Sequence, residues 1–161
     1  MSDFDKDLFQ LRLNRSENDL WPMLDRLYGA HPGYDAMQVN LLKAMRKAAK
    51  ARAADLKRQD LVRDLEPDWF QRPDMVGYVF YIDRFAGDLA AVHDKLDHLA
   101  SLGVTYVHLM PCLHPRPGDS DGGYSVMDYR SVNPVFGTMD DLQALATALR
   151  ARGMSLCIDM V

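Results

Sequence analysis

The chain has 161 residues, of which 48% are hydrophobic and 26% charged, so it can form a packed core and is not globally disordered. Its formal net charge of −4 argues against general nucleic-acid binding. No apolar run approaches the roughly 18 residues of a membrane span, and the acidic N-terminus is unlike a signal peptide. We therefore expect a cytoplasmic protein with neither nucleic-acid nor membrane partners.

The first 74 residues are predicted to form a helical domain. One helix is expected to begin near Leu20 and to end at Gly29. A longer helix is expected from about Asp35 to just before Pro67, because apolar residues recur there at spacings of three and four. This stripe consists of Leu42, Met45, Ala49, Ala53 and Leu56. The basic residues on the other faces are interpreted as solvated, because no aromatic residues are interleaved for base stacking.

From Gly77 the pattern changes to alternating strands and helices. Short apolar runs rich in β-branched and aromatic residues predict strands, and amphipathic segments between them predict helices. Thr138 is expected to cap the second of these helices. The predicted order is strand 77–85, helix 88–103, strand 104–111, a long loop 112–137, helix 138–153 and strand 155–161. This order predicts a βαβαβ unit with a parallel sheet.

Two kinds of parallel sheet fit this order. A dinucleotide-binding fold needs a glycine-rich turn after its first strand. The segment at that place, DRFAGDL, holds only one glycine, so this fold is disfavoured. The other is a (β/α)8 TIM barrel, in which the loops after the strands build the active site, and a loop as long as 112–137 is usually functional. We therefore predict an α/β chain with an all-helical domain at 1–74. Residues 75–161 would then form the first three strands of an incomplete barrel, since a complete one takes about 250 residues.

Several segments together resemble one enzyme family. GYVFYIDRFAGDL, GVTYVHLMP, SDGGYSVMDYRSVNPVFGTMDDL and SLCIDMV occur in this order, and they are similar to the start of an amylosucrase. Amylosucrases are sucrose-using transglucosylases of the α-amylase superfamily, glycoside hydrolase family 13. The helical leader ending in EPDWFQRPDMVGY also resembles the all-helical N-terminal domain of that family.

The resemblance implies a reaction. Sucrose would be cleaved with retention by a carboxylate nucleophile and an acid/base glutamic acid, and the glucosyl group would pass to an α-1,4-glucan or to water. Sucrose and α-glucan would be the partners of the whole enzyme, with no cofactor. In this family the nucleophile and the acid/base lie beyond the part matched here, so no catalytic residue is assigned and the chain is expected to be inactive by itself.

The resemblance also implies substrate-binding residues. Asp121 matches the aspartate at the floor of the glucosyl subsite, and Tyr124 matches the tyrosine that stacks on the glucosyl ring. The chemistry agrees, because a pyranose has an apolar face for an aromatic ring and hydroxyls for a carboxylate. Gly122 and Gly123 would let the backbone bend so that both side chains face one pocket.

Other polar residues are given supporting roles. Asp128 and Tyr129 are expected to shape the loop, and Asp83 to be structural near the end of the first strand. Asp159 matches the aspartate that opens a conserved strand motif of the superfamily. His108 and His114 are not interpreted as a metal site, because no third ligand is evident. The two cysteines, Cys112 and Cys157, lack paired spacing and are expected to be reduced and buried.

Other functions also fit the sequence. A sucrose hydrolase, in which water replaces the glucan acceptor, would share every segment quoted above. A non-catalytic interaction module or remnant, with the helical leader as a binding surface, belongs to a different class. The unpaired edge of the last strand also predicts self-association of the chain.

Overall fold

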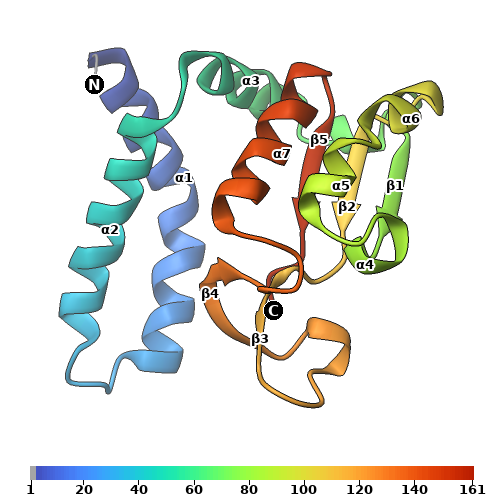
Figure 1. Cartoon of the computed structure of the whole chain (residues 1–161). Coiled ribbons are helices and arrows are strands. Elements are labelled where there is room, and N and C mark those ends of the chain that lie inside the picture. The colour runs from blue at the N-terminus through green and yellow to red at the C-terminus, as the bar shows by residue number, and fades with distance from the viewer. Residues whose placement is uncertain (1–2) are drawn as a thin grey trace. The chain divides into compact units, whose positions relative to one another are not determined.

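The computed structural model describes residues 3–161 and divides them into two compact units (Figure 1). The helical unit extends to Pro67, and the sheet unit comprises Asp68–Val161. The observed boundary at Pro67 lies before the boundary at residue 74 that the sequence predicted. The reason is that residues 68–76 attach to the sheet unit. Thr105 Oγ1 donates to Asp74 O at 3.1 Å and accepts from Val76 N at 3.0 Å. Among the helices of residues 3–161, none is long and apolar enough to cross a membrane.

The helical unit contains α1 (Asp3–Tyr28), α2 (Tyr34–Ala51) and α3 (Ala54–Leu65). The first helix thus begins well before Leu20 and continues through Pro22. The single long helix predicted from Asp35 is wrong, because Arg52 and Ala53 are extended, with ψ of 131° and 149°. Of the predicted stripe, Ala53 lies at this break and is exposed, whereas Leu42, Met45, Ala49 and Leu56 are half-buried.

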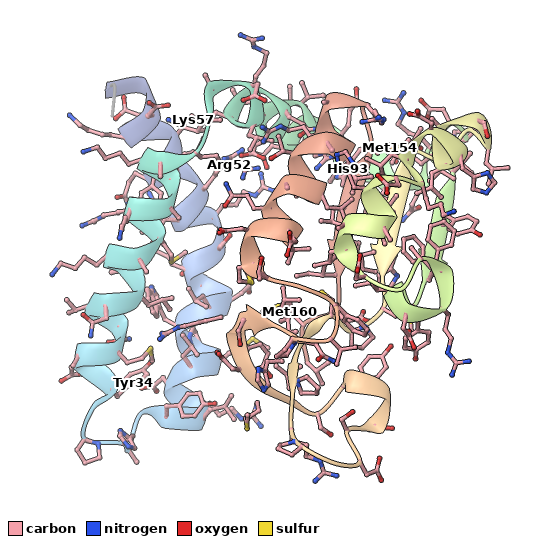
Figure 2. All side chains as sticks on the ribbon, viewed as in Figure 1. Tyr34, Arg52, Lys57, His93, Met154 and Met160 are labelled. Atoms are coloured by element: carbon pink, nitrogen blue, oxygen red, sulfur yellow. The ribbon has the colours of Figure 1, made fainter. Side chains whose placement is uncertain are left out.

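Ion pairs accompany the break between α2 and α3. The Arg52 guanidinium binds both oxygens of Asp60 across the turn, with Nη2 and Oδ1 2.7 Å apart. Arg12 of α1 binds Asp64 of α3 at 2.6 Å, and Lys57 binds Asp5 at 3.2 Å. These pairs connect α3 to α1, which requires the chain to turn after α2; Arg52 and Lys57 are labelled in Figure 2. The hydrogen bond from Arg52 lowers the pKa of the Asp60 carboxyl.

The sheet unit confirms the predicted parallel βαβαβ order. Strands β1 (Gly77–Phe80), β2 (Tyr106–Leu109) and β5 (Ser155–Ile158) form one sheet in the order β1-β2-β5, and both pairings are parallel. The helices between them are α5 (Leu89–His93), α6 (Leu96–Ser101) and α7 (Met139–Ala151). The shorter elements are η1 (Trp69–Gln71), α4 (Ile82–Phe85), β3 (Leu113–Pro115), η2 (Asp121–Gly123) and β4 (Val126–Val132).

Several predicted elements have other bounds in the structure; strand 155–161, for example, ends at Ile158, so Asp159 lies after it. Strand 77–85 ends at Phe80, and α4 follows because Ile82 is buried and the Phe85 ring packs 4.3 Å from that of Phe80. Helix 88–103 is interrupted at Asp94 and Lys95. The loop 112–137 contains an antiparallel pair of strands, β3 and β4.

The two faces of the sheet differ in burial. Val107 and Leu109 of β2 are fully buried against a core built largely from the helices, which includes Leu96, Leu99, Leu145 and Leu149. Side chains alternate between faces along a strand, so His108 lies on the opposite face, level with Val79 and Cys157 in the register. On this open face Val79 is 57% exposed.

The cysteines are both free thiols, as predicted, but only one of them is buried. Burial raises the pKa of Cys112 to about 11, which makes its thiol unreactive at neutral pH. Cys157 is half-buried because it lies on the open face of the sheet. The prediction of two buried cysteines is therefore wrong for Cys157.

Helix α7 begins with the predicted cap. Thr138 Oγ1 accepts from Asp141 N at 3.2 Å, and Asp141 Oδ2 accepts from Thr138 N at 2.8 Å, so the two residues form a capping box. We expect Thr138→Ala to lower the free energy of unfolding by about 1 kcal/mol, because the Asp141 N–H loses its side-chain acceptor and the Asp141 carboxylate loses the hydroxyl that donates to it. The shift in urea midpoint measures it.

Thr147→Ala is the matched control on the same helix. The Thr147 hydroxyl is exposed and donates to Gln143 O one turn back, at 2.9 Å, an arrangement that does not favour the helix. A loss as large as that of Thr138→Ala would contradict the capping role.

Candidate sugar-binding site

The candidate site lies where the parallel strands end. Tyr81 follows β1, Pro111 follows β2 and Asp159 follows β5. The segment from β3 to β4 extends from this same end of the sheet unit (Figure 1). In parallel sheets this edge carries the functional loops, and the predicted residues 121–124 belong to the segment between β3 and β4.

A sharp backbone bend shapes this segment. Asp121, Gly122 and Gly123 all have positive φ, of 53°, 66° and 97°. A Cβ on Gly123 would lie 3.0 Å from Pro111 Cβ and 3.4 Å from Pro111 O, so a side chain cannot fit there without movement. The glycines thus bring the loop against the end of β2, in the conformation that glycine adopts most readily.

Tyr124 follows the bend and is half-buried. Its pKa is raised by burial, and then by the charge of Asp159, a hydrogen-bonding contact with that carboxylate, and the charges of Tyr81 and Asp121. The Tyr124 hydroxyl and the Asp159 carboxylate lie within reach of each other, but their geometry falls short of a closed hydrogen bond. Tyr124 therefore stands over the end of β5.

The sequence predicted that Asp121 forms the floor of the pocket that Tyr124 faces, and the structure arranges Asp121 differently. Its side chain is exposed, and its backbone N–H donates to Asp119 Oδ1 at 3.3 Å. The structure thus leaves the Asp121 side chain at the surface, whereas the Tyr124 hydroxyl has a hydrogen-bonding contact with Asp159.

His108 is a site residue that the sequence reading missed. Its Nε2 lies 3.0 Å from Asp159 Oδ1. The other oxygen, Asp159 Oδ2, is buried and has no hydrogen-bond partner among residues 3–161. Strand alternation would have revealed the pair only after the register had been established, since His108 is level with Cys157, two positions before Asp159.

Asp128 and Tyr129 are engaged locally. Asp128 accepts from Arg130 N at 2.8 Å and from Ser131 Oγ at 2.6 Å. The Ser131 hydroxyl, followed by the Arg130 amide, lowers the pKa of the Asp128 carboxyl. The Tyr129 hydroxyl donates to the carbonyl of Val161. Asp128 is thus bonded within β4, and Tyr129 joins β4 to the chain after β5.

A cleft of about 640 Å³ lies beside the bend. It combines two aromatic rings with charged and amide side chains, a mixture that suits a hydroxyl-rich ligand. Its lining residues are Tyr81, Asp83, Arg84, Pro111, Ser120, Gly122, Gly123, Asn133 and Phe136. Asp83, expected to be structural near a strand end, lies instead in α4 and lines this cleft.

No metal site emerges from these groups. Within the described part of the chain, no cluster of three or more histidine, cysteine, aspartate or glutamate side chains could hold an ion. His108 pairs with Asp159, and His114 lies opposite Asp128 in the β3–β4 register. An aromatic ring and carboxylates are the groups that this arrangement offers to a polar ligand.

The sheet and its loops define the class of protein. Three consecutive parallel strands, with helices against one face and a polar site at the carboxyl end, form the first part of a (β/α)8 barrel. The sequence profile of the family described as "Alpha amylase, catalytic domain" matches residues 10–161. The chain belongs to the alpha-amylase family, which includes glycoside hydrolases and transferases.

Individual relatives act on glucosides. The chain is 39% identical over 75 residues to an oligo-1,6-glucosidase of Heyndrickxia coagulans, which covers 47% of this chain and 13% of that enzyme. It is 36% identical over 102 residues to a trehalose-6-phosphate hydrolase of Escherichia coli K12, covering 59% of this chain and 18% of that one.

A solved structure supports the same placement. The trehalulose synthase MutB of Pseudomonas mesoacidophila, as a variant in complex with its substrate sucrose, aligns with a TM-score of 0.50 at 32% identity. The alignment covers 59% of this chain and 17% of MutB. The chain thus spans less than a fifth of the length of the relatives described here.

Proposed function

We propose that this chain supplies the glucosyl-binding wall of a retaining, sucrose-using glucosyltransferase of the amylosucrase type. The observation that carries the proposal is Tyr124, half-buried after a three-residue backbone bend and standing beside Asp159 at the carboxyl end of the sheet. The amylosucrase-like segments and the similarity to a sucrose-bound trehalulose synthase support sucrose as the substrate.

In this function the residues of the chain bind and orient the sugar. The Tyr124 ring would stack on the apolar face of the glucosyl unit, and carboxylate oxygens near it would accept hydrogen bonds from hydroxyls. Retention needs a nucleophile and an acid/base held on opposite sides of the scissile bond. We assign neither role within residues 1–161, so the chemical step would fall to groups elsewhere in the whole protein, and α-1,4-glucan would be the acceptor.

A glucosidase that transfers to water is the second candidate. It is favoured by the 39% identity to an oligo-1,6-glucosidase. A sucrose hydrolase would likewise release glucose without building glucan. The protein encoded by the complete reading frame separates these functions. Fructose release with α-1,4-glucan formation supports the transferase, equal release of glucose and fructose supports the hydrolase, and cleavage of isomaltose in preference to sucrose supports the glucosidase.

We expect the 161-residue chain to bind D-glucose weakly and to release no glucose or fructose from sucrose. Tyr124→Ala should weaken glucose binding about tenfold or more, because the stacking ring is lost. Tyr129→Ala is the matched control, since its exposed ring lies on β4 and its hydroxyl contacts Val161. NMR titration with glucose measures the affinity of each variant.

Two results would contradict this proposal. Equal losses in Tyr124→Ala and Tyr129→Ala would show that the sugar does not bind at Tyr124. Turnover of sucrose by the 161-residue chain, abolished in Tyr124→Ala, would show that an acid/base pair exists within the chain.

A further inference from the structure

The strongest unexplained feature of the site is the contact between His108 and Asp159. Both side chains lie outside the buried core cluster. Their side chains remain partly open, with exposed fractions of 32% for His108 and 22% for Asp159. His108 in β2 and Asp159 just after β5 are joined at 3.0 Å. The pair lies near Tyr124, and no function has yet been assigned to it.

We propose that His108 is a positioning residue that holds Asp159 by one carboxylate oxygen and thereby keeps the carboxylate directed at the Tyr124 hydroxyl. This proposal rests on the proposed function only in assigning Tyr124 to a sugar. The linkage of the three residues is a property of the folded chain itself.

The sheet geometry places the first two members. His108 pairs with Cys157 in the parallel register, and Asp159 is two residues further along. Positions two apart point to the same side of a strand, so both side chains belong to the open face. An ionised carboxylate can only accept hydrogen bonds, so the His108 Nε2 must carry the proton and donate it to Asp159 Oδ1.

The carboxylate is then restrained on one side only. Asp159 Oδ2 is buried without a hydrogen-bond partner in the described part of the chain, which is costly unless a donor approaches. Tyr124 is the donor whose hydroxyl lies within reach of this carboxylate. If His108 did not hold Oδ1, the side chain of Asp159 could rotate toward solvent and leave the tyrosine.

The titration of the Tyr124 phenol can report the orientation of Asp159. Burial raises the pKa of its phenol first, followed by the charge and hydrogen-bonding contact of Asp159, then by the charges of Tyr81 and Asp121. A change in the orientation of Asp159 therefore changes the titration of Tyr124. The chain has seven tyrosines, so selective ¹³Cζ-tyrosine labelling with Tyr124→Phe for assignment isolates the one signal.

We expect the Tyr124 midpoint of the wild-type chain to lie above the ordinary tyrosine value and to fall in Asp159→Asn. His108→Leu, whose side chain cannot donate a hydrogen bond, should also lower the Tyr124 midpoint. His108→Gln should keep it near wild type, because its amide N–H can donate to Oδ1. Asp121→Asn is the control and should shift the midpoint less than Asp159→Asn. The dispersion of the other tyrosine signals reports whether each variant is folded.

The outcomes separate the linkage from the sugar site. A midpoint unchanged in His108→Leu, or lowered equally in His108→Gln, would overturn the positioning role. If His108→Leu does not fold, His108→Asn replaces it, since this polar side chain is too short to reach Asp159. D-Glucose is then added to the folded variants. If the midpoints shift as expected but glucose leaves the Tyr124 signal unmoved, His108 positions Asp159 and the proposed sugar site is wrong.

Discussion

Replacement of Leu99 by alanine is expected to lower the free energy of unfolding of the sheet unit by about 2–5 kcal/mol. Leu99 lies in α6, is completely buried and belongs to the core cluster that covers β2. Removing its branched side chain loses the burial of three carbon atoms and leaves a cavity among side chains that cannot fully collapse. A urea titration followed by circular dichroism measures the change.

Leu102→Ala provides the comparison at the end of the same segment. Leu102 is 51% exposed, so its replacement should cost no more than about 0.5 kcal/mol. Similar losses in the two variants would mean that α6 does not pack against the sheet as described here. The pair of variants therefore tests the burial pattern of the sheet unit independently of any ligand.

Gly123→Ala is expected to destabilise the sheet unit by about 2–4 kcal/mol and to displace the Tyr124 loop. Two effects add: an alanine at φ of 97° is strained, and its Cβ would meet Pro111 Cβ at 3.0 Å. Pro111 is buried at the end of β2, so it cannot easily move away. The urea midpoint gives the loss, and the Tyr124 NMR signal gives the displacement.

Gly118→Ala separates strain from steric conflict in the same segment. Gly118 also has positive φ, of 79°, but nothing lies within 4 Å of an added Cβ. Only the conformational cost of about 1 kcal/mol should remain. If Gly118→Ala proves as harmful as Gly123→Ala, the close approach of the loop to Pro111 is not what selects glycine there.

Local chemistry allowed part of the fold to be predicted. The cap at Thr138 and Asp141 involves residues three apart, so its presence in the structure follows directly from the sequence. The apolar run 104–111 predicted a buried strand, and β2 lies at the centre of the sheet. In contrast, α4 forms because Ile82 and Phe85 pack back against Phe80 and the core, and strand propensity alone does not contain that information.

In the helical unit, too, a local pattern predicted one feature, while another feature involves contacts between distant residues. The spacing of apolar residues predicted one buried stripe on a single long helix, and the structure leaves Leu42, Met45 and Ala49 half-buried on α2. The break at Arg52 and Ala53 has no glycine or proline to mark it. Ion pairs between residues as far apart as Arg12 and Asp64 accompany the break, and these residues become neighbours only after the helices pack.

For the site, the sequence by itself determined the chemical groups and their order along the chain. The glycines at 122 and 123 and the tyrosine that follows them were predicted for the sugar site in this way, whereas Asp159 was noted only as part of a strand motif. Only the tertiary structure decided which groups meet. It placed Asp159 with His108 and Tyr124 and left Asp121 exposed. The reason is that register and strand order bring together residues 51 positions apart, and no local pattern encodes that separation.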